Sequence, residues 1–381
     1  MITIKPLSDF LSEYVDRNIE NKYPPVAVGR YGIRTRESIY SKELAKDYSK
    51  NKLIRKNTLT VGMGSNQVDI GILSDDKIYS VSPAYHTYNI NGINVDYLRY
   101  CLEHRNQDMF IRYAKRGSRQ GKTIDFSRWL NYVIPVYSEE IQSKIVIKLN
   151  KISFIIRKRE EVLKLYDQLT SSLFIEMFGD PIINTKKWKK EKCKNILTKI
   201  GSGATPQGGS ESYKEEGISL IRSMNVHNGR FESKDLAYID EKQAQKLDNV
   251  NIKENDVLIN ITGASVARCC IVPSYVIPAR VNQHVSVLRC SDMVNSIFLC
   301  YQIINDSYQN LLKKIGTSGG ATREAITKKQ IEDLEVILPP LELQNKFANF
   351  VRGTDKSKLA VKKSLEELEI LKKSLMQKYF A

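Results

Sequence analysis

The chain has 381 residues, of which 41% are apolar and 27% carry a charge. This length can bury more than one hydrophobic core, and the composition is too polar for an integral membrane protein. Lysine and arginine outnumber aspartate and glutamate by 59 to 43, so the formal net charge is +16 at pH 7. Such an excess favours a polyanionic partner over a small neutral substrate.

The cysteines and histidines indicate neither a disulfide framework nor a metal site. No two of the six cysteines form a C-x-x-C pair, and the four histidines are scattered. The first residues lack the pattern of a signal peptide, and no apolar stretch approaches the ~18 residues that a membrane span needs. We therefore expect a cytoplasmic protein with buried, reduced thiols, no metal and no membrane contact.

Residues 1–135 are predicted to form a mixed α+β globule. Short β-rich runs, among them a turn that feeds a strand at 53–61, precede a helical pattern at 95–114. A polar stretch rich in glycine and serine follows at 116–123. The strand-like segment 133–135 ends this globule, because Pro135 does not fit the interior of the helix that follows.

Residues 136–180 are predicted to form one long helix. From Ile145 to Met177, mostly apolar residues recur at alternating spacings of four and three, with lysine, arginine and glutamate between them. A helix of this kind would be roughly 55 to 60 Å long at about 1.5 Å per residue. Such a length is typical of a helix that packs along a seam with a second one.

Residues 181–338 are predicted to form a second α+β globule. Its β-rich runs include 256–261 and 285–289, and its main helical pattern covers 296–314. A Gly/Ser/Thr-rich stretch follows at 316–323, and the pair Pro339–Pro340 ends the domain. The order of elements therefore repeats that of the first globule.

The repeat extends to a second long helix at 339–381. Residues 139–179 align with 341–381 at a constant offset and without a gap, so that Gln142 matches Gln344 and Phe178 matches Phe380. We predict an α+β protein with two globular domains, 1–135 and 181–338, in pseudo-two-fold tandem. The helices 136–180 and 339–381 separate them and form an antiparallel coiled coil.

Motifs that carry catalysis are incomplete in this sequence. The stretch 116–123 nearly spells a P-loop but has Arg116 where the first glycine belongs. Residues 316–320 fit G-x-S-x-G, yet no histidine follows His284 to complete a triad. An amino-methyltransferase carries an Asn/Asp-Pro-Pro-aromatic loop. Residues 180–183 have only one proline and no aromatic residue, so this loop is incomplete. We expect a chain without catalytic activity of its own.

A basic, repeated, non-catalytic chain with two globules is best interpreted as a DNA reader. Lysine and arginine would contact phosphates, while arginine, amide and hydroxyl side chains would read base edges. The helix pair would hold one reading domain for each of two half-sites. Two alternatives stay open: a coiled-coil scaffold or adaptor that ignores nucleic acid, and an RNA-binding protein that stacks bases on some of the 20 tyrosines.

Several motifs in a fixed order resemble a known family. They are Phe-Gly-Asp-Pro at 178–181, Trp188, the run Ile-Gly-Ser-Gly-Ala-Thr-Pro at 200–206, residues 217–226, and Leu-Pro-Pro-Leu-Glu-Leu-Gln at 338–344. Together with the repeat they resemble the DNA-specificity subunit of type I restriction-modification systems over essentially the whole chain. The resemblance implies that each globule is a target-recognition domain for one half of a bipartite site in double-stranded DNA, and that each long helix is a spacer.

The resemblance also implies partners and the location of the chemistry. The helices would dock two methyltransferase subunits, and restriction-translocase subunits would join for cleavage. S-adenosylmethionine, ATP and Mg²⁺ would then belong to those partners, and this chain would hold no cofactor.

The candidate DNA-contacting residues are polar side chains in loops and strands that can reach phosphates or base edges. In the first globule they are Arg30, Arg34, Arg36, Ser65, Asn66, Gln67, Arg116, Ser118, Arg119, Gln120 and Lys122. In the second they are Thr205, Arg222, Asn225, His227, Arg230, Ser265, Arg268, Arg280, Asn282, Gln283, Thr317, Ser318 and Arg323.

Overall fold

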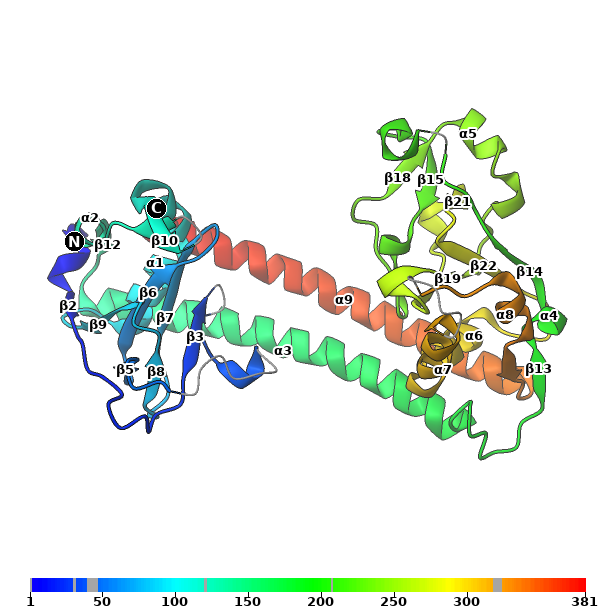
Figure 1. Cartoon of the computed structure of the whole chain (residues 1–381), viewed down its shortest axis with the longest axis horizontal. Helices are drawn as coiled ribbons and strands as arrows, with labels where there is room; N and C mark the ends of the chain where they lie inside the picture. Colours follow the sequence, from blue (N-terminus) through cyan, green and yellow to red (C-terminus); the bar gives the residue numbers. More distant parts are fainter. Residues whose placement is uncertain (1, 30–31, 40–46, 120–121, 207, 318–323) are drawn as a thin grey trace. The chain divides into compact units, whose positions relative to one another are not determined.

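The structure is a computed structural model of the chain (Figure 1). It describes residues 2–29, 32–39, 47–119, 122–206, 208–317 and 324–381, with the backbone alone at 117–119 and 122. The chain divides into two compact units, residues 1–160 with 363–381 and residues 161–362. Each unit therefore combines one globule with a part of both long helices.

The first globule is built from short strands and one long helix. Its elements are β1 (Thr3–Pro6), β2 (Leu11–Glu13), β3 (Val26–Gly29), β4 (Gly32–Thr35), β5 (Lys52–Ile54), β6 (Thr58–Met63), β7 (Val68–Ile72), β8 (Tyr79–Val81), β9 (His86–Ile90), α1 (Val95–Tyr113), β10 (Ala114–Arg119), β11 (Lys122–Ile124), α2 (Phe126–Trp129) and β12 (Val133–Val136).

An antiparallel sheet in the order β2-β9-β6-β7 forms the centre of this globule. Helix α1 packs beside β7 (Figure 1). The side-chain amide of Asn106 on α1 pairs with both backbone groups of Val68, donating at 2.8 Å and accepting at 3.0 Å, and so closes that end of the edge strand. The core contains the fully buried Tyr97 and Trp129.

The second globule contains more helices than the first, and each of them is shorter than α1. Its elements are β13 (Lys190–Lys192), α4 (Cys193–Ile196), β14 (Leu197–Ser202), β15 (Ile218–Ile221), β16 (Val226–His227), β17 (Arg230–Phe231), β18 (Ala237–Ile239), α5 (Glu241–Gln245), β19 (Val257–Asn260), β20 (Cys269–Ile271), β21 (Ala279–Val281), β22 (Val285–Cys290), α6 (Ser296–Ile304), α7 (Asp306–Thr317), α8 (Lys328–Asp333) and β23 (Glu335–Ile337).

Its central sheet has the order β14-β22-β19-β20, which repeats the pattern of the first globule. A second sheet, β18-β15-β21, adds a parallel pair between β15 and β21. The turn before each central strand is also repeated, because Asn57 and Asn255 both have a φ of 64°. The predicted α+β class and the internal repeat are confirmed.

One prediction about the second globule is wrong in detail. The helical pattern at 296–314 is two helices, α6 and α7, which are separated at Asn305. The backbone of Asn305 is extended, and its side chain accepts the backbone N–H of Ser307 at 3.1 Å. Asparagine in this position caps a new helix, so the apolar pattern continues across a break in the backbone.

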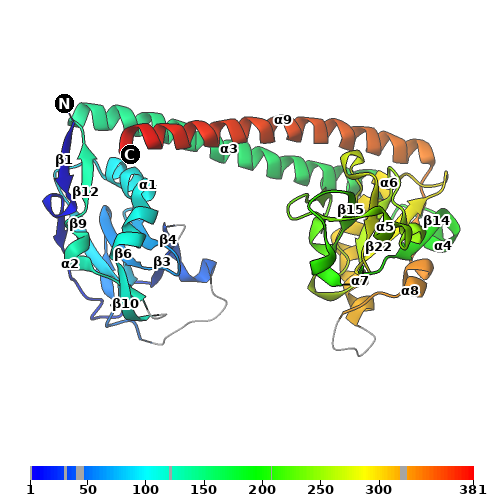
Figure 2. The same ribbon diagram turned by 90° about the horizontal axis from the view of Figure 1, so that it is seen from above.

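The long helices α3 (Glu139–Phe178) and α9 (Leu341–Phe380) have 40 residues each. Every predicted seam position, from Ile145 to Met177 and from Phe347 to Tyr379, is buried or half-buried. Within each unit the two helices lie side by side, as Figure 2 shows. In the first unit the start of α3 shares a core with the end of α9, and in the second the end of α3 shares a core with the start of α9, so the pairing is antiparallel.

The end of α9 is part of the core of the first globule. Phe380 is fully buried and meets the ring of Tyr97 edge to face, with 5.2 Å between centroids. Met376 lies in the same core. The equivalent residue of α3, Phe178, is fully buried against Phe298 and Phe347 in the second unit. The last turn of each long helix thus completes a globule.

Candidate nucleic-acid interface

In the second globule, loops from four strand ends are tied together by hydrogen bonds. The backbone N–H of Gly203, after β14, donates to the carbonyl of Asn282, and the N–H of Asn282 donates to the carbonyl of Ile221 at the end of β15. The N–H of Ile261, after β19, donates to the carbonyl of His284. These bonds bring the loops 203–206, 222–225, 260–265 and 282–284 to one place, which we call the loop cluster.

Gly203 allows two of these loops to touch. A Cβ atom at this position would lie 1.6 Å from the carbonyl oxygen of Val281, far inside contact distance. Only glycine permits this approach. The glycine-rich run at 200–206 therefore has a structural reason, which is the packing of one loop of the cluster against another.

A chain of polar side chains runs across the loop cluster. The hydroxyl of Thr205 donates to the amide oxygen of Gln283. The amide nitrogen of Gln283 lies 3.2 Å from Nε2 of His284, and Nδ1 of His284 lies 2.6 Å from the hydroxyl of Thr262. Thr205 and Gln283 are exposed, whereas Thr262 and His284 are half-buried. Two predicted contact residues, Thr205 and Gln283, thus meet here with Thr262 and His284, which lie in segments expected to face DNA but are not among the candidate contact residues.

Three predicted residues near the cluster serve the fold. Asn225 is fully buried, and its amide donates to the carbonyls of Glu232 and Lys234. Asn282 is buried, and its side-chain oxygen accepts the backbone N–H of His284. This hydrogen bond forms the turn at whose tip Gln283 is exposed. The half-buried Arg222 lies over the ring of Tyr213, 5.4 Å from its centroid.

Arg280 is not an exposed DNA-reading residue. It lies in β21 and is 7% exposed. Its guanidinium forms an ion pair of 2.6 Å with Asp248 and donates to the carbonyl of Ala244 and the side chain of Asn251. Because these groups occupy its donors inside the domain, we leave Arg280 out of the proposed interface and correct the prediction.

The other predicted residues of the second globule lie around the cluster or beside the helices. Ser265 accepts a hydrogen bond from the amide of Asn260 within the cluster, and Arg268 is half-buried nearby. Thr317 is exposed and donates to the carbonyls of Lys313 and Lys314 at the end of α7. His227 and Arg230 line a different hollow, described below. Ser318 and Arg323 lie outside the described residues.

In the first globule the described predicted residues lie in three segments, which are the β6–β7 turn, strand β4 with the turn that follows it, and the β10–β11 hairpin. Ser65, Asn66 and Gln67 form the turn between β6 and β7, where the N–H of Gly64 donates to the carbonyl of Gln67. Arg34 is exposed on β4, and Arg36 lies over the ring of Tyr48.

The third segment is the β10–β11 hairpin, which packs beside β6. Arg116 is exposed on it. Arg30 and Gln120 lie outside the described residues, and only the backbone is described at Ser118, Arg119 and Lys122.

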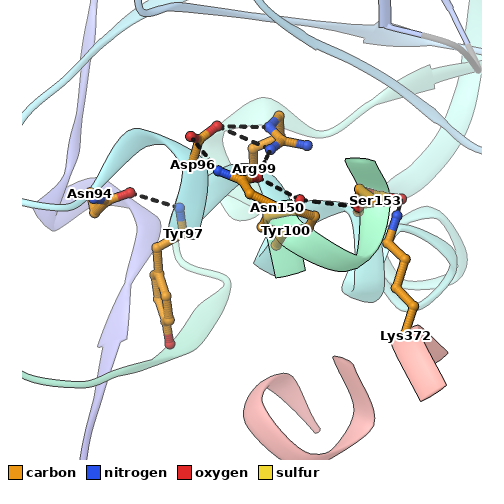
Figure 3. Close-up of polar contacts among 9 residues, drawn as sticks. Asn94, Asp96, Tyr97, Arg99, Tyr100, Asn150, Ser153 and Lys372 are labelled. Carbon is orange, nitrogen blue, oxygen red and sulfur yellow. Dashed lines mark hydrogen bonds and ion pairs between the residues drawn. The ribbon is translucent and has the colours of Figure 1, made fainter. Parts of the chain in front are cut away.

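A polar network connects α1 of the first globule to both long helices (Figure 3). The hydroxyl of Tyr100 donates to the side-chain oxygen of Asn150 on α3 at 2.7 Å, and Nζ of Lys372 on α9 lies 5.7 Å from the Tyr100 ring centroid. Arg99 pairs with Asp96 at 3.0 Å and stacks on the Tyr100 ring. This network fixes the globule to its part of the helix pair.

In the second unit the corresponding junction contains a hollow of about 590 Å³. Lys358 of α9 reaches across to Asp167 of α3 at 2.6 Å and lies 3.6 Å from Asp355. Burial raises the pKa of Asp355, and the nearby Lys358 opposes that shift. A charged residue at a predicted seam position is therefore held by an ion pair across the helices.

Most of the thiols are buried. Five of the six cysteines are buried, and Cys290 is half-buried. Burial raises the pKa of Cys101 and of Cys193 to about 12. In the parts of the chain that the structure describes, no group of three or more metal-ligating side chains comes together, and no helix has an apolar stretch long enough to cross a bilayer.

Comparison with known proteins agrees with this architecture. Residues 185–370 match the family model of the type I restriction modification DNA specificity domain. A putative type I restriction enzyme MjaX specificity subunit from Methanocaldococcus jannaschii is 24% identical over 302 residues, which cover 76% of this chain and 68% of the relative. The MjaVIII specificity subunit of the same organism is 22% identical over 384 residues, which cover 95% of this chain and 86% of the relative.

Solved structures share the fold. The crystal structure of a type I restriction-modification S subunit from M. genitalium superposes with a TM-score of 0.59 at 16% identity, covering 100% of this chain and 96% of that one. A chain from a study of complex assembly and conformational transition of the type I R-M system gives a TM-score of 0.56 at 16% identity, covering 99% and 97%.

Fold and sequence together define an α+β protein with two similar globules and paired long helices. Its residues 185–370 match the family model of the type I restriction modification DNA specificity domain, and the resemblance of the chain to type I restriction-modification specificity subunits is confirmed.

Proposed function

We propose that this chain is the sequence-reading subunit of a type I restriction-modification complex, and that each globule reads one half of a bipartite target in double-stranded DNA. The observation that carries the proposal is the repetition of the central sheet, β2-β9-β6-β7 and β14-β22-β19-β20. Each copy ends in loops that present amide, hydroxyl and guanidinium groups, which bind phosphates and base edges. The net charge of +16 supports a polyanionic ligand.

Binding of DNA by the chain in complex with its methyltransferase subunits tests the proposal. We expect the affinity to fall linearly with salt on a double-logarithmic plot, and to depend on sequence at two separated half-sites. Equal binding of double-stranded RNA would favour the RNA-binding alternative. Absence of salt-dependent nucleic-acid binding would favour the scaffold alternative.

Independence of the two half-sites is a stricter test. Arg34 lies exposed on β4 of the first globule. If it reads a base, Arg34→Ala should relax discrimination at one half-site by about 1–3 kcal/mol and leave the other unchanged. Loss at both half-sites together would instead indicate a failed assembly.

We also propose that the long helices dock two methyltransferase subunits. Large apolar side chains are exposed on them, including Leu165 (60%) and Leu169 (51%) on α3 and Leu359 (69%) on α9. Exposed apolar patches on a stable helix mark protein contacts. Leu165→Glu combined with Leu169→Glu should reduce co-purification of methyltransferase, whereas Gln168→Glu on the same exposed stretch should not.

Catalysis is assigned to the partners in this proposal. The methyltransferase subunits would bind S-adenosylmethionine and flip the target base, and restriction-translocase subunits would use ATP and Mg²⁺. The complex would work in the cytoplasm, where its DNA is. Methylation should therefore require the partners, and this chain alone should transfer no methyl group in an assay with labelled S-adenosylmethionine.

The spacing between half-sites is proposed to depend on the two 40-residue helices. Seven residues preserve the seam of a coiled coil. Insertion of one heptad into both α3 and α9 should lengthen the DNA spacer that the complex accepts and leave the half-site sequences unchanged. Methylome sequencing of a host that expresses the complex would show the spacer length and the half-site sequences. An unchanged spacer length would contradict this role of the helices.

A further inference from the structure

We propose that Gln283 reads an adenine in the second half-site, and that His284 and Thr262 are positioning residues that hold its amide for this contact. The inference rests on the proposed function and identifies the base that one position of the loop cluster recognises. It starts from the contrast between Gln283, which is exposed, and its neighbours Asn282 and Val285, which are buried.

The backbone beneath Gln283 is fixed on both sides. Asn282 donates its N–H to the carbonyl of Ile221, and its carbonyl accepts the N–H of Gly203 and that of Val285. The side chain of Asn282 accepts the N–H of His284 at 3.1 Å. Gln283 is therefore the tip of a turn whose position is set by three loops of the globule.

The amide of Gln283 is also oriented, because a partner lies at each end. An amide nitrogen can only donate, so Nε2 of His284, 3.2 Å away, accepts. The proton of the neutral imidazole then lies on Nδ1 and is donated to the hydroxyl of Thr262 at 2.6 Å. The amide oxygen of Gln283 accepts the hydroxyl of Thr205.

Counting donors and acceptors shows what remains for a ligand. A glutamine amide has two N–H donors and two lone pairs on oxygen. The contacts with His284 and Thr205 use one of each, so with respect to the residues that the structure describes, one donor and one acceptor remain on an exposed side chain. If the amide is reversed, His284 donates from Nε2 to the oxygen and the nitrogen donates to Thr205, and the remaining groups are the same.

A paired donor and acceptor matches one base edge in the major groove. Adenine presents its N7 acceptor next to its N6 amino donor, and glutamine binds both at once. Guanine presents two acceptors on that edge, cytosine an amino donor, and thymine an acceptor beside a methyl group, so none of them satisfies both amide groups. The residual hydrogen-bonding capacity of Gln283 therefore selects adenine.

The test uses the intact complex with its methyltransferase subunits and a target duplex in which each adenine of the second half-site is replaced in turn by 7-deazaadenine. This base lacks the N7 acceptor but keeps its pairing. We expect one replacement to weaken binding by the unmodified protein, and the same replacement to have no further effect on Gln283→Ala. If no adenine of that half-site responds, the inference is overturned without the need for any variant.

Variants give a second, directional readout. Gln283→Ala should lower discrimination at the responding position by about 5- to 150-fold, the range expected for one bidentate contact. Gln283→Glu has only acceptors and should shift the preference at that position towards cytosine, whose amino group donates. His284→Ala and Thr262→Val should reduce discrimination there in part. Gln245→Ala, an exposed glutamine on α5, is the matched control and should leave every position unchanged.

The outcomes separate this inference from the function on which it rests. A complex that binds all duplexes alike would refute the proposed function. A complex that discriminates at both half-sites, but in which no position responds to Gln283→Ala or Gln283→Glu, would refute the inference alone. Discrimination at the other positions of the second half-site serves as the folding control for each variant, and discrimination at the first half-site shows that the complex has assembled.

Discussion

The amide oxygen of Gln344 accepts the backbone N–H of Asn295 at 2.8 Å, at the point where α6 begins. Its amide nitrogen donates to the carbonyl of Pro339. In the first unit Gln142 makes the same pair of bonds, to the N–H of Asn94 and the carbonyl of Tyr137. One glutamine in the first turn of each long helix thus bonds to the residue that begins a helix of a globule, α1 in the first unit and α6 in the second. The internal repeat therefore extends to individual hydrogen bonds.

We predict that Gln344→Leu destabilises the second unit by about 1–3 kcal/mol, because a buried N–H and a buried carbonyl lose their partner. Gln344 is fully buried and Gln142 is 4% exposed, so Gln142→Leu should act similarly on the first unit. Hydrogen exchange should show faster exchange at the start of α6 in one variant and at the start of α1 in the other. Gln168→Leu, on the exposed side of α3, is the control and should change neither.

Arg280→Ala should cost stability and not specificity. The variant removes an ion pair with Asp248 and hydrogen bonds to Ala244 and Asn251 inside the globule. We expect a loss of about 1.5–3 kcal/mol in the free energy of unfolding, the range for hydrogen bonds to a charged group. Urea denaturation measures it. A stable variant that misreads a single base pair would restore Arg280 to the interface.

Gly203→Ala should disrupt the loop cluster. The added Cβ atom would collide with the backbone carbonyl of Val281, which cannot move without breaking β21. We expect loss of recognition at the second half-site, together with faster proteolysis of the loops 203–206 and 282–284. Gly201→Ala provides the comparison, because a Cβ atom there meets no other atom within 4 Å. Equal behaviour of the two variants would contradict the close approach.

The stability of the first unit should decrease in mild acid through His86. Burial lowers the pKa of His86, with a further contribution from Lys52 and an opposing one from Glu13, and its ring stacks on Phe126 at 3.6 Å. A histidine that stays neutral in the fold contributes stability above its unfolded pKa of about 6.5. This contribution is lost as the pH falls through the lowered folded pKa.

Urea midpoints at pH 7.5 and pH 5.5 test this effect. His86→Phe keeps the aromatic contact and removes the titrating group, so it should lose less stability between the two pH values than the unmodified chain. An identical loss in both proteins would show that other groups cause the acid sensitivity.

Sequence reasoning predicted the features that depend on a regular period. The long helices follow from apolar residues at spacings of four and three, and the structure has helices α3 and α9 within the two predicted segments. It missed the break at Asn305, although the residues Asn-Asp-Ser are typical of a helix start, because the apolar pattern runs on through Leu312.

The candidate site was harder to predict, because contacts between distant residues decide which side chains are exposed. Arg280 was predicted to read DNA, yet its guanidinium donates to Asp248, which lies 32 positions away in the chain. Gln283 was predicted as a contact residue, whereas the segments around Thr262 and His284 were predicted only as candidate loops, without the hydrogen bonds by which these two residues orient Gln283. The turn at Asn282 was the local signal that the residue after it would be displayed.

The burial of Phe380 and Met376 in the core of the first globule has a consequence for synthesis. A ribosome that has finished the first globule and α3 must still translate about 200 residues before these two side chains emerge, which takes about 10–40 s at 5–20 residues per second. During that interval the apolar surface of the first globule that will contact Met376 and Phe380 is exposed to water. A nascent chain stalled before Met376 should therefore be a better substrate for holding chaperones than the released protein.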